Sequence, residues 1–471
     1  MQKSDKRYGI QMNLFEKEEW TANVPVIDGI AVSYAEQGQV DEYLPGEEEA
    51  MPLATNVLEQ VIALANLSEA CGRVISNNGS PGIDEMTVEE LREWFAKNWR
   101  TLQDELRNGL YKIQGVRTVM IPKPKGGERQ LGIPTVKDRL VQQAISQVLS
   151  KLYEPKFSPN SYGFRLGRSA HGAIDQLGDY IEAGKTYIVD IDMAKFFDEV
   201  NHDRLLARLR QSIDDSKLLK LIHGYLQSGI LQGGLIEQRI KGTPQGSPLS
   251  PLLSNIVLDE LDKELTKRGH SYVRYADDIV IAVGSQKSAE RVESSVTTFI
   301  EESLKLKVNR SKSAIRRPIE LNYLGHGFMN NGTPILSKSS EQRLKDKIRK
   351  LTKRNRGRSF EQVKAELRSS LRGWLNYFYK AQMKSRLEQI DGWIRRRLRC
   401  YRLKQCKRAK GMMRFLHKLG IPKTRAWTTA TSRKGWWRMS LTPASHEGMN
   451  MKWFETEDVY SLSYHYSLLH S

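Results

Sequence analysis

Hydrophobic residues recur at helical spacing over much of the N-terminal half of the chain. This periodicity predicts helices over Val57–Arg73, Val88–Asn108 and Val136–Leu152. The run from Asn77 to Gly82, which is rich in Asn, Gly, Ser and Pro, breaks the pattern after the first of these helices. The same spacing predicts three further helices, over Leu205–Gly229, Pro248–Arg268 and Ser285–Leu304.

Short apolar runs between these helices predict strands. Thr186–Ile191 is β-branched and apolar, and Asp192 follows it directly, which is typical of a buried strand. Arg117–Pro122 predicts a strand ahead of a glycine-containing turn, and Tyr272–Val283 predicts a hairpin. This mixture of elements predicts an α+β fold, in which helices back an antiparallel sheet. After Pro334 the strand signals largely stop, and basic helices are expected to about Leu419.

Charge is distributed unevenly along the 471 residues. The chain carries 74 Lys and Arg against 55 Asp and Glu, a formal net charge of +19. Residues 1–50 contain 4 basic and 11 acidic residues, whereas Ile335–Lys434 contains 31 basic and 6 acidic residues. Basic residues interleaved with aromatic ones suit a nucleic acid, whose backbone they follow and whose bases they stack on. The alternative is a helical bundle with a basic surface and an aromatic core.

The cysteines and the apolar runs narrow the class of protein. Cys71, Cys400 and Cys406 are scattered and form no CxxC pair, so neither a disulfide framework nor a zinc site is predicted. No apolar run approaches the length that spans a membrane, and the N-terminus lacks the apolar core of a signal peptide. We expect a protein of the bacterial cytoplasm or nucleoid, without a membrane partner.

Three carboxylates form the candidate catalytic group. Asp277 and Asp278 are adjacent in the predicted hairpin, and Asp192 ends the predicted strand before it. Such a set suits two divalent ions that stabilise the attacking and leaving oxygens of a phosphoryl transfer. Mg²⁺ is expected, with Mn²⁺ as a substitute, because Mg²⁺ prefers carboxylates together with substrate phosphates. The alternative for the Asp pair is a solvent-exposed turn.

Three segments in this order resemble the palm motifs of group II intron reverse transcriptases: Ile188–Leu205 (IVDIDMAKFFDEVNHDRL), Gly242–Ile256 (GTPQGSPLSPLLSNI) and Arg274–Asp278 (RYADD). The resemblance implies an RNA-directed DNA polymerase with Asp192, Asp277 and Asp278 as its catalytic and metal-binding residues. It covers about Leu53 to Trp453.

Two aspartates of the first motif compete for the metal-binding role, because Asp190 and Asp192 share one face of a regular strand. The family pattern selects Asp192. The resemblance further implies the backbone carbonyl of Met193 as a candidate metal ligand. It also implies Phe197 as a steric gate that rejects a ribose 2′-hydroxyl, whereas ordinary core packing is the alternative for this side chain.

A second group of residues is implied to bind the incoming dNTP. Arg117, Lys123 and Arg129 are spaced six residues apart around a glycine turn, and they resemble the triphosphate contacts of the family. Without the resemblance they would indicate a generic basic hairpin. Gln245 lies in a Pro-Gln-Gly loop that flanks the incoming nucleotide in the family.

Other segments resemble the template side of these enzymes. Arg165 and Arg168, in SYGFRLGRS, are predicted to contact the template or the nucleotide. Asn309 and Lys312, in VNRSKS, match the next palm motif, with a structural role left open. Asn78–Asp84 (NGSPGID) resembles the N-terminal loop that covers the template.

The basic C-terminal region resembles the thumb or maturase region of the family. A thumb holds the template–product duplex through its backbone, and the same region in maturases grips intron RNA. The nucleic-acid contacts predicted here are Arg372, Trp374, Arg395, Arg396 and Arg397. The tail after Leu419 is expected to be a small DNA-binding module, or a set of Trp residues packed onto the thumb.

These features predict a right-hand polymerase with fingers, an antiparallel palm sheet and a helical thumb. The expected parts are an acidic extension, mobile or loosely docked (1–52), fingers and palm (53–334), a basic thumb or maturase domain (335–419) and a tail (420–471). The expected partners are group II intron RNA, an RNA template with a DNA primer, dNTPs and target DNA.

No endonuclease module is expected, as in group IIC-type relatives, so the enzyme would extend an existing 3′ end. The alternatives are a splicing-only maturase with a silent polymerase and a domesticated enzyme of defence or repair.

Overall fold

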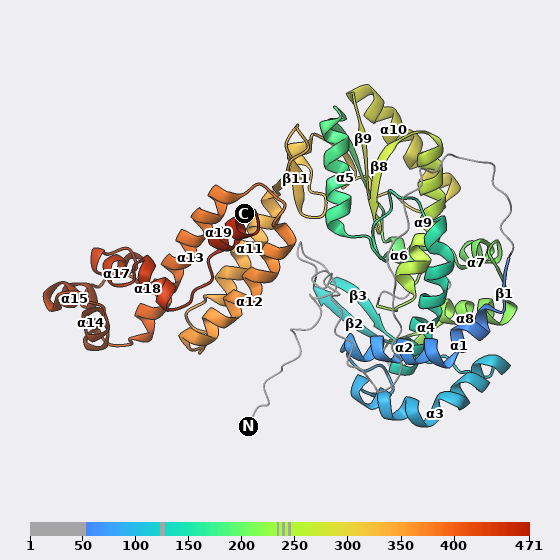
Figure 1. Ribbon diagram of the computed structural model, residues 1–471, viewed down its shortest axis with the longest axis horizontal. Coiled ribbons are helices and arrows are strands. Elements are labelled where there is room, and N and C mark those ends of the chain that lie inside the picture. Colours follow the sequence, from blue (N-terminus) through green and yellow to red (C-terminus); the bar gives the residue numbers. More distant parts are fainter. Residues whose placement is uncertain (1–52, 123–127, 233–234, 238–240, 244–245) are drawn as a thin grey trace. The chain divides into compact units, whose positions relative to one another are not determined.

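A computed structural model describes residues 53–122, 128–232, 235–237, 241–243 and 246–471 (Figure 1). The predicted extension 1–52 therefore lies outside the described residues. The chain divides into two compact units. Unit 1 contains the described residues up to Ala173, together with Ile191–Ile281 and Glu290–Ala314; unit 2 contains Ile174–Asp190, Ala282–Ala289 and Ile315–Ser471.

Unit 1 contains four N-terminal helices and a four-stranded sheet. The helices are α1 (Val57–Ile62), α2 (Leu64–Ser76), α3 (Val88–Asn108) and α4 (Val136–Tyr153). The sheet has the order β3-β2-β6-β7, formed by β2 (Val116–Pro122), β3 (Glu128–Ile133), β6 (Ile230–Gln232) and β7 (Leu235–Glu237). The β2–β3 hairpin is antiparallel (Figure 1).

Local sequence explains the clean ends of α3. Thr87 and Glu90 form a capping box at the first turn, in which each side chain accepts from the backbone N–H of the other residue. Gly109 ends the helix with φ of 69°, a left-handed conformation that glycine adopts without a steric penalty. The predicted and observed bounds of this helix therefore agree.

A second four-stranded sheet has the order β10-β4-β9-β8. Its strands are β4 (Tyr187–Asp192), β8 (Ser271–Tyr275), β9 (Asp278–Val283) and β10 (Ala314–Arg316). The helical elements between α4 and Val308 are η1 (Glu154–Lys156), α5 (Ala170–Glu182), α6 (Phe196–Glu199), α7 (His202–Arg210), α8 (Ser216–Gln227), α9 (Ser250–Lys267), α10 (Gln286–Thr298) and a π-helical turn (Phe299–Ser303). Helix and sheet content together confirm the α+β prediction.

Two predicted helices are interrupted, and side chains explain both breaks. Between α1 and α2, Asn66 donates to the Val61 carbonyl at 2.8 Å and Gln103 donates to the Ile62 carbonyl at 2.6 Å. These bonds occupy carbonyls that a continuous helix would use. Between α7 and α8, the short strand β5 (Ile213–Asp214) pairs with β1 (Ala54–Thr55), and Asp215 then caps α8.

Unit 2 is largely helical after a small hairpin. The hairpin consists of β11 (His326–Phe328) and β12 (Pro334–Leu336), after the short turn η3 (Pro318–Glu320). The helices are α11 (Lys338–Leu351), α12 (Phe360–Phe378), α13 (Lys384–Gln405), α14 (Ala409–Lys418), α15 (Lys423–Ala430), α16 (Trp436–Met439), α17 (Pro443–Gly448), α18 (Met451–Thr456) and α19 (Leu462–Leu468). Helices therefore dominate where basic helices were predicted.

The last helix of the chain packs back onto the long helices of unit 2. One apolar core runs from Leu336 on β12 to Tyr466 on α19, and Trp453 lies against it. The Tyr466 hydroxyl donates to the Ala381 carbonyl at 3.0 Å. Buried Asp391 of α13 accepts from the backbone N–H of Leu462 at 3.0 Å and from the hydroxyl of Ser461 at 2.8 Å. The tail is therefore an integral part of this helical core.

No helix in the part of the chain described by the structure is long and apolar enough to cross a membrane.

Replacing Asp391 with Ala should loosen α19 without unfolding the rest of unit 2. The substitution leaves buried N–H groups at the start of α19 without their acceptor, which costs about 1–3 kcal/mol. We expect a melting temperature lower by several degrees and faster amide hydrogen exchange in Leu462–Leu468. Glu388→Ala, at an exposed position of the same helix, is the control and should change neither quantity. Equal exchange in both variants would show that Asp391 does not hold the tail.

Candidate active site

The loop after α10 holds the backbone around Asp192 from two directions. Asn309 N–H donates to the Asp192 carbonyl at 2.8 Å, and the Asp192 N–H donates to the Ser313 hydroxyl at 3.0 Å. Met193 is buried and forms an antiparallel bridge with Val308. The end of β4 is thus fixed by backbone bonds, while the Asp192 carboxylate stays about one-third exposed.

Asp190 and Asp192 have different basic partners. The Lys312 ammonium lies 3.3 and 3.2 Å from the two carboxylate oxygens of Asp192. The Arg316 Nε donates to Asp190 at 3.0 Å. Lys312, which is 61% exposed, therefore supplies a positive charge at the carboxylate that the family pattern selects. The structure thus assigns Lys312 a direct contact with Asp192, whereas Asn309 acts through its backbone.

The Asp277 and Asp278 pair lies at a tight turn. Asp277 is in the turn between β8 and β9, and Asp278 is the first residue of β9. Ala276 precedes them with φ of 56°, a left-handed conformation that costs a non-glycine residue free energy. Gly163 lies so close that an added Cβ would come within 2.3 Å of the Ala276 nitrogen. The turn is therefore held by close backbone packing, and only glycine fits at position 163.

The carboxylates fit a divalent cation in their chemistry. Asp192 is the last residue of β4, and Asp278 is the first residue of its neighbour β9 in the sheet order. Both supply hard oxygen ligands of the kind that Mg²⁺ prefers. Within the described ranges, no three acidic, His or Cys side chains already stand in metal-binding geometry. In this structure the Lys312 ammonium lies 3.2 Å from a carboxylate oxygen of Asp192.

Phe197 lies where the first and second motifs meet. It belongs to the short helix α6, and its carbonyl accepts from the Thr243 N–H at 2.6 Å. Gly242 adopts φ of 89°, and an added Cβ would approach the Asp198 backbone at 2.9 Å. Buried His202 closes the contact through a 2.7 Å bond between its Nε2 and the Gly242 carbonyl. The loop of the second motif is thus attached directly to the predicted gate residue.

The second motif also contacts the β2–β3 sheet and α4. An added Cβ at Gly246 would lie 2.6 Å from the Gly132 carbonyl oxygen on β3. The Ser247 hydroxyl donates to Gln142 on α4 at 2.7 Å. Gln245, which the sequence predicts at the nucleotide, lies outside the described residues. Of the described residues nearest to it, Thr243 bonds to α6 and Gly246 lies against β3.

The predicted triphosphate contacts are only partly described. Arg117 is exposed on β2 and pairs in register with Ile133 on β3. Arg129 pairs with Ile121, but its side chain is outside the described set, as is the whole of Lys123. The hairpin geometry places Arg117 and Arg129 on paired strands, which is compatible with one binding surface.

The two arginines of SYGFRLGRS differ in their surroundings. Arg165 is almost fully buried and donates to Glu154 at 2.8 Å and to the carbonyls of Ser158 and Ser161. Its guanidinium thus secures the loop internally. Arg168 lies over the Tyr162 ring, with 5.5 Å between its guanidinium carbon and the ring centroid. Their predicted template contacts stay predictions.

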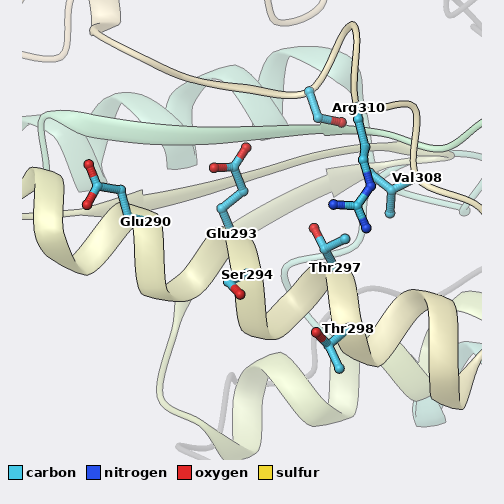
Figure 2. Close-up of a pocket in the computed structure, with 8 residues that line it drawn as sticks. Glu290, Glu293, Ser294, Thr297, Thr298, Val308 and Arg310 are labelled. Carbon is cyan, nitrogen blue, oxygen red and sulfur yellow. The ribbon is translucent and has the colours of Figure 1, made fainter.

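The loop that holds Asp192 also forms one wall of a pocket of about 310 Å³. Helix α10 forms the opposite wall, with Glu290, Glu293 and Thr297 among its lining residues. Figure 2 shows the Arg310 side chain reaching across toward Thr297. Arg310 also pairs with Glu301 at 2.7 Å, and this ion pair links the loop to the π-helical turn after α10.

Within unit 2 the predicted nucleic-acid contacts divide into two classes. Arg396 lies 3.7 Å from the Trp437 ring centroid, and Arg397 donates to the Thr352 hydroxyl at 2.5 Å. Trp374 packs on Phe378, with ring centroids 4.9 Å apart. By contrast, the side chains of Arg372 and Arg395 make no hydrogen bond or ion pair with any residue that the structure describes. Among the five predicted contacts, these two guanidinium groups can therefore bind a phosphate without first breaking such a bond.

Sequence reasoning missed the polar network beneath the acidic turn. Arg274 of RYADD is fully buried and pairs with Asp262 on α9, which is buried too. Asn255 joins the network from the second motif by accepting from Arg274 at 2.9 Å. The sequence did contain a signal for this network, namely an arginine inside an apolar strand. Because a buried charge must be paired, Arg274 could have been predicted to have a buried acidic partner.

Two family models match the chain. The model described as reverse transcriptase (RNA-dependent DNA polymerase) matches residues 121–328, which include Asp192, Phe197, Asp277 and Asp278. The model described as group II intron, maturase-specific domain matches residues 341–420. The order of the two matches agrees with the predicted order of polymerase and maturase regions.

The chain is also similar in sequence to proteins with curated descriptions. Protein YkfC of Escherichia coli K12 is 32% identical over 58% of this chain and 81% of its own length. Group II intron-encoded protein LtrA of Lactococcus lactis is 29% identical over 51% of both chains. Nuclear intron maturase 3, mitochondrial, of Arabidopsis thaliana is 27% identical over 47% of this chain and 34% of its own length. The chain thus spans most of YkfC but only half or less of the other two. These matches show that the chain belongs to the family of group II intron reverse transcriptases and maturases.

Proposed function

We propose that this protein is an RNA-directed DNA polymerase that also binds group II intron RNA as a maturase. The observation that carries the polymerase activity is the placement of Asp192 and Asp278 at the ends of neighbouring sheet strands, with Asp277 in the adjoining turn. The contact between Phe197 and the loop of the second motif supports the same site. The predicted division into extension, fingers and palm, thumb, and tail is part of this proposal.

Asp192, Asp277 and Asp278 would hold two Mg²⁺ ions, with the Met193 carbonyl as a further candidate ligand and Mn²⁺ as a substitute. When bound, the ions would stabilise the negative charge on the attacking and leaving oxygens. The chain's own residues provide the positioning. Backbone bonds from Asn309 and Ser313 keep the end of β4 in place. Lys312 offsets the charge of Asp192.

The nucleotide pocket would be completed by Arg117, Lys123 and Arg129 at the triphosphate. Phe197 and Gln245 would lie at the sugar and base. Arg and Lys suit a triphosphate because they donate charged hydrogen bonds to its oxygens. The proposed substrates are dNTPs and an RNA template with a DNA primer.

The maturase function is proposed for the basic helices of unit 2. The match to the maturase-specific domain covers Arg372 and Arg395, whose side chains make no hydrogen bond or ion pair with the described residues. Cations of this kind neutralise phosphates and release counterions. We propose intron RNA as the polyanion, with target DNA as a second one during intron mobility.

Removing the carboxylate of Asp192 should abolish DNA synthesis, whereas removing that of Asp190 should not. We expect Asp192→Asn and Asp277→Asn to lower primer extension on an RNA template about a thousandfold, because ion stabilisation contributes several kcal/mol. Asp190→Asn is the matched control on the same face of β4, and its rate should stay within about threefold of the parent. Full activity of Asp192→Asn would contradict the proposed site. If the parent protein binds intron RNA tightly but does not extend the primer, the result would favour the alternative of a splicing-only maturase.

Shortening Phe197 should weaken discrimination against ribonucleotides. In Phe197→Val the sugar loses its aromatic barrier, so we expect the ratio of dNTP to rNTP incorporation to fall about 10- to 100-fold. Single-nucleotide primer extension with each substrate measures this ratio. Buried Phe196, whose ring meets that of Phe197 at 5.4 Å, provides the control. Phe196→Leu should lower stability and keep the selectivity of the parent.

Neutralising the two available thumb cations should weaken binding of folded intron RNA. For Arg372→Gln/Arg395→Gln we expect a smaller dependence of affinity on salt, by about 0.7–0.9 in the log–log slope for each phosphate that the protein no longer neutralises. Filter binding over a salt series gives the slope. Arg397→Gln is the comparison: it should lower the melting temperature, because Arg397 bonds Thr352 within unit 2. If the double variant keeps the salt dependence of the parent, Arg372 and Arg395 do not contact the phosphates of the intron RNA.

A further inference from the structure

We propose that Arg274 and Asp262 are positioning residues, which hold the peptide before Asp277 so that the acidic turn keeps the geometry needed for nucleotide addition. This inference rests on the proposed polymerase function and deepens it. Neither side chain would touch a substrate. Both would act through the backbone of Ala276.

The Arg274 guanidinium connects the acidic turn to α9. Its Nε donates to the two carboxylate oxygens of Asp262 at 2.8 and 3.0 Å, and its Nη2 donates to one of them at 2.5 Å. Its Nη1 donates to the Ala276 carbonyl at 3.0 Å. Because that carbonyl belongs to the residue directly before Asp277, a shift of the guanidinium moves the peptide that carries the catalytic side chain.

The same arginine ties two further segments to the turn. Its Nη1 also donates to Asn255 Oδ1 at 2.9 Å, and Asn255 Nδ2 donates to the Gly163 carbonyl at 2.9 Å. Gly163 in turn lies against the Ala276 nitrogen. The Arg274 backbone carbonyl accepts from the Tyr162 N–H at 2.9 Å. One buried side chain thus sets the positions of the acidic turn, the second motif and the SYGFRLGRS loop together.

The cost of this arrangement argues for a positional role. Arg274 and Asp262 are both 0% exposed, and two charges buried in this way must be fully paired. An apolar pair of similar volume could fill the same space. Such a pair could not donate to the Ala276 carbonyl, which would leave the left-handed conformation of Ala276 without this support. The ion pair therefore provides directional bonds that simple packing would not provide.

The decisive variant replaces both partners, Arg274→Met/Asp262→Leu. Since no buried charge is left unpaired, the melting temperature should stay within about 5 °C of the parent. A misplacement of the acidic turn by about 1 Å should lower the rate of single-nucleotide addition by about 10- to 100-fold. Binding of the primer–template should not change. Asp262→Asn alone is less informative, because it leaves a buried charge with a poorer partner and can prevent folding.

Two further measurements separate positioning from general stability. The first is Mn²⁺ binding to the protein without nucleic acid, followed by electron paramagnetic resonance, whose midpoint concentration should rise several-fold in the double variant. The second is partial recovery of the rate in Arg274→Lys/Asp262→Glu, a pair that keeps its charges. The matched control is Arg204→Met/Glu260→Leu, an ion pair at 2.8 Å between α7 and α9 that does not reach the acidic turn. It should keep the rate and the metal midpoint of the parent.

The outcomes are distinct. A folded Arg274→Met/Asp262→Leu variant with the parent's rate and metal midpoint would overturn the inference and leave the polymerase function intact. Absence of primer extension by the parent protein would instead contradict the proposed function. If the double variant and the Arg204/Glu260 control lose equal amounts of rate and metal affinity, the Arg274–Asp262 pair only stabilises the protein in general. That result would also overturn the inference.

Discussion

Concentrating carboxylates at strand ends is the constraint that shapes unit 1. Asp277 and Asp278 are adjacent, and Asp192 ends the neighbouring strand of the sheet. Like charges repel, so backbone bonds that fix these residues, together with the Lys312 ammonium at Asp192, help to keep them in place. The loop from Val308 to Ser313 holds Asp192, and the Arg274 network holds the turn. Helix α9 supplies Asp262 and Asn255, the buried partners of the Arg274 network.

The excess of basic residues serves two purposes that the net charge alone does not separate. Arg165, Arg274 and Arg397 are used within the protein, where they donate to carboxylates, carbonyls and a hydroxyl. Burial lowers the pKa of Arg399 to about 10, and its Nε donates to the Met449 carbonyl. Arg372 and Arg395 keep their charges available. A high count of arginines thus overstates the surface that can bind nucleic acid.

Much of the fold could be predicted from local pattern. The bounds of α3 were predicted correctly because a capping box and a C-terminal glycine end it within its own sequence. The hairpin of β8 and β9 followed from two short strand-like segments on either side of the Ala276-Asp277-Asp278 turn. The break between α1 and α2 was missed because Gln103, far away in the sequence, takes the Ile62 carbonyl. The buried role of Arg165 was missed for the same reason, as its partners became visible only in the folded chain.

The sequence by itself determined which chemistry the protein offers: three aspartates, a glycine-rich motif and a basic C-terminal region, all in an order typical of one family. These features are local, and their residue types and spacing can be read without a fold. Only the tertiary structure decided which charges are available and which are consumed. Asp192 and Asp190 look equivalent on a strand, yet one contacts Lys312 and the other Arg316. Arg274 and Arg372 are both arginines, yet one is buried against Asp262 and the other is exposed. Pairing of charges depends on distances between segments remote in sequence, and those distances are set by how the helices and sheets pack.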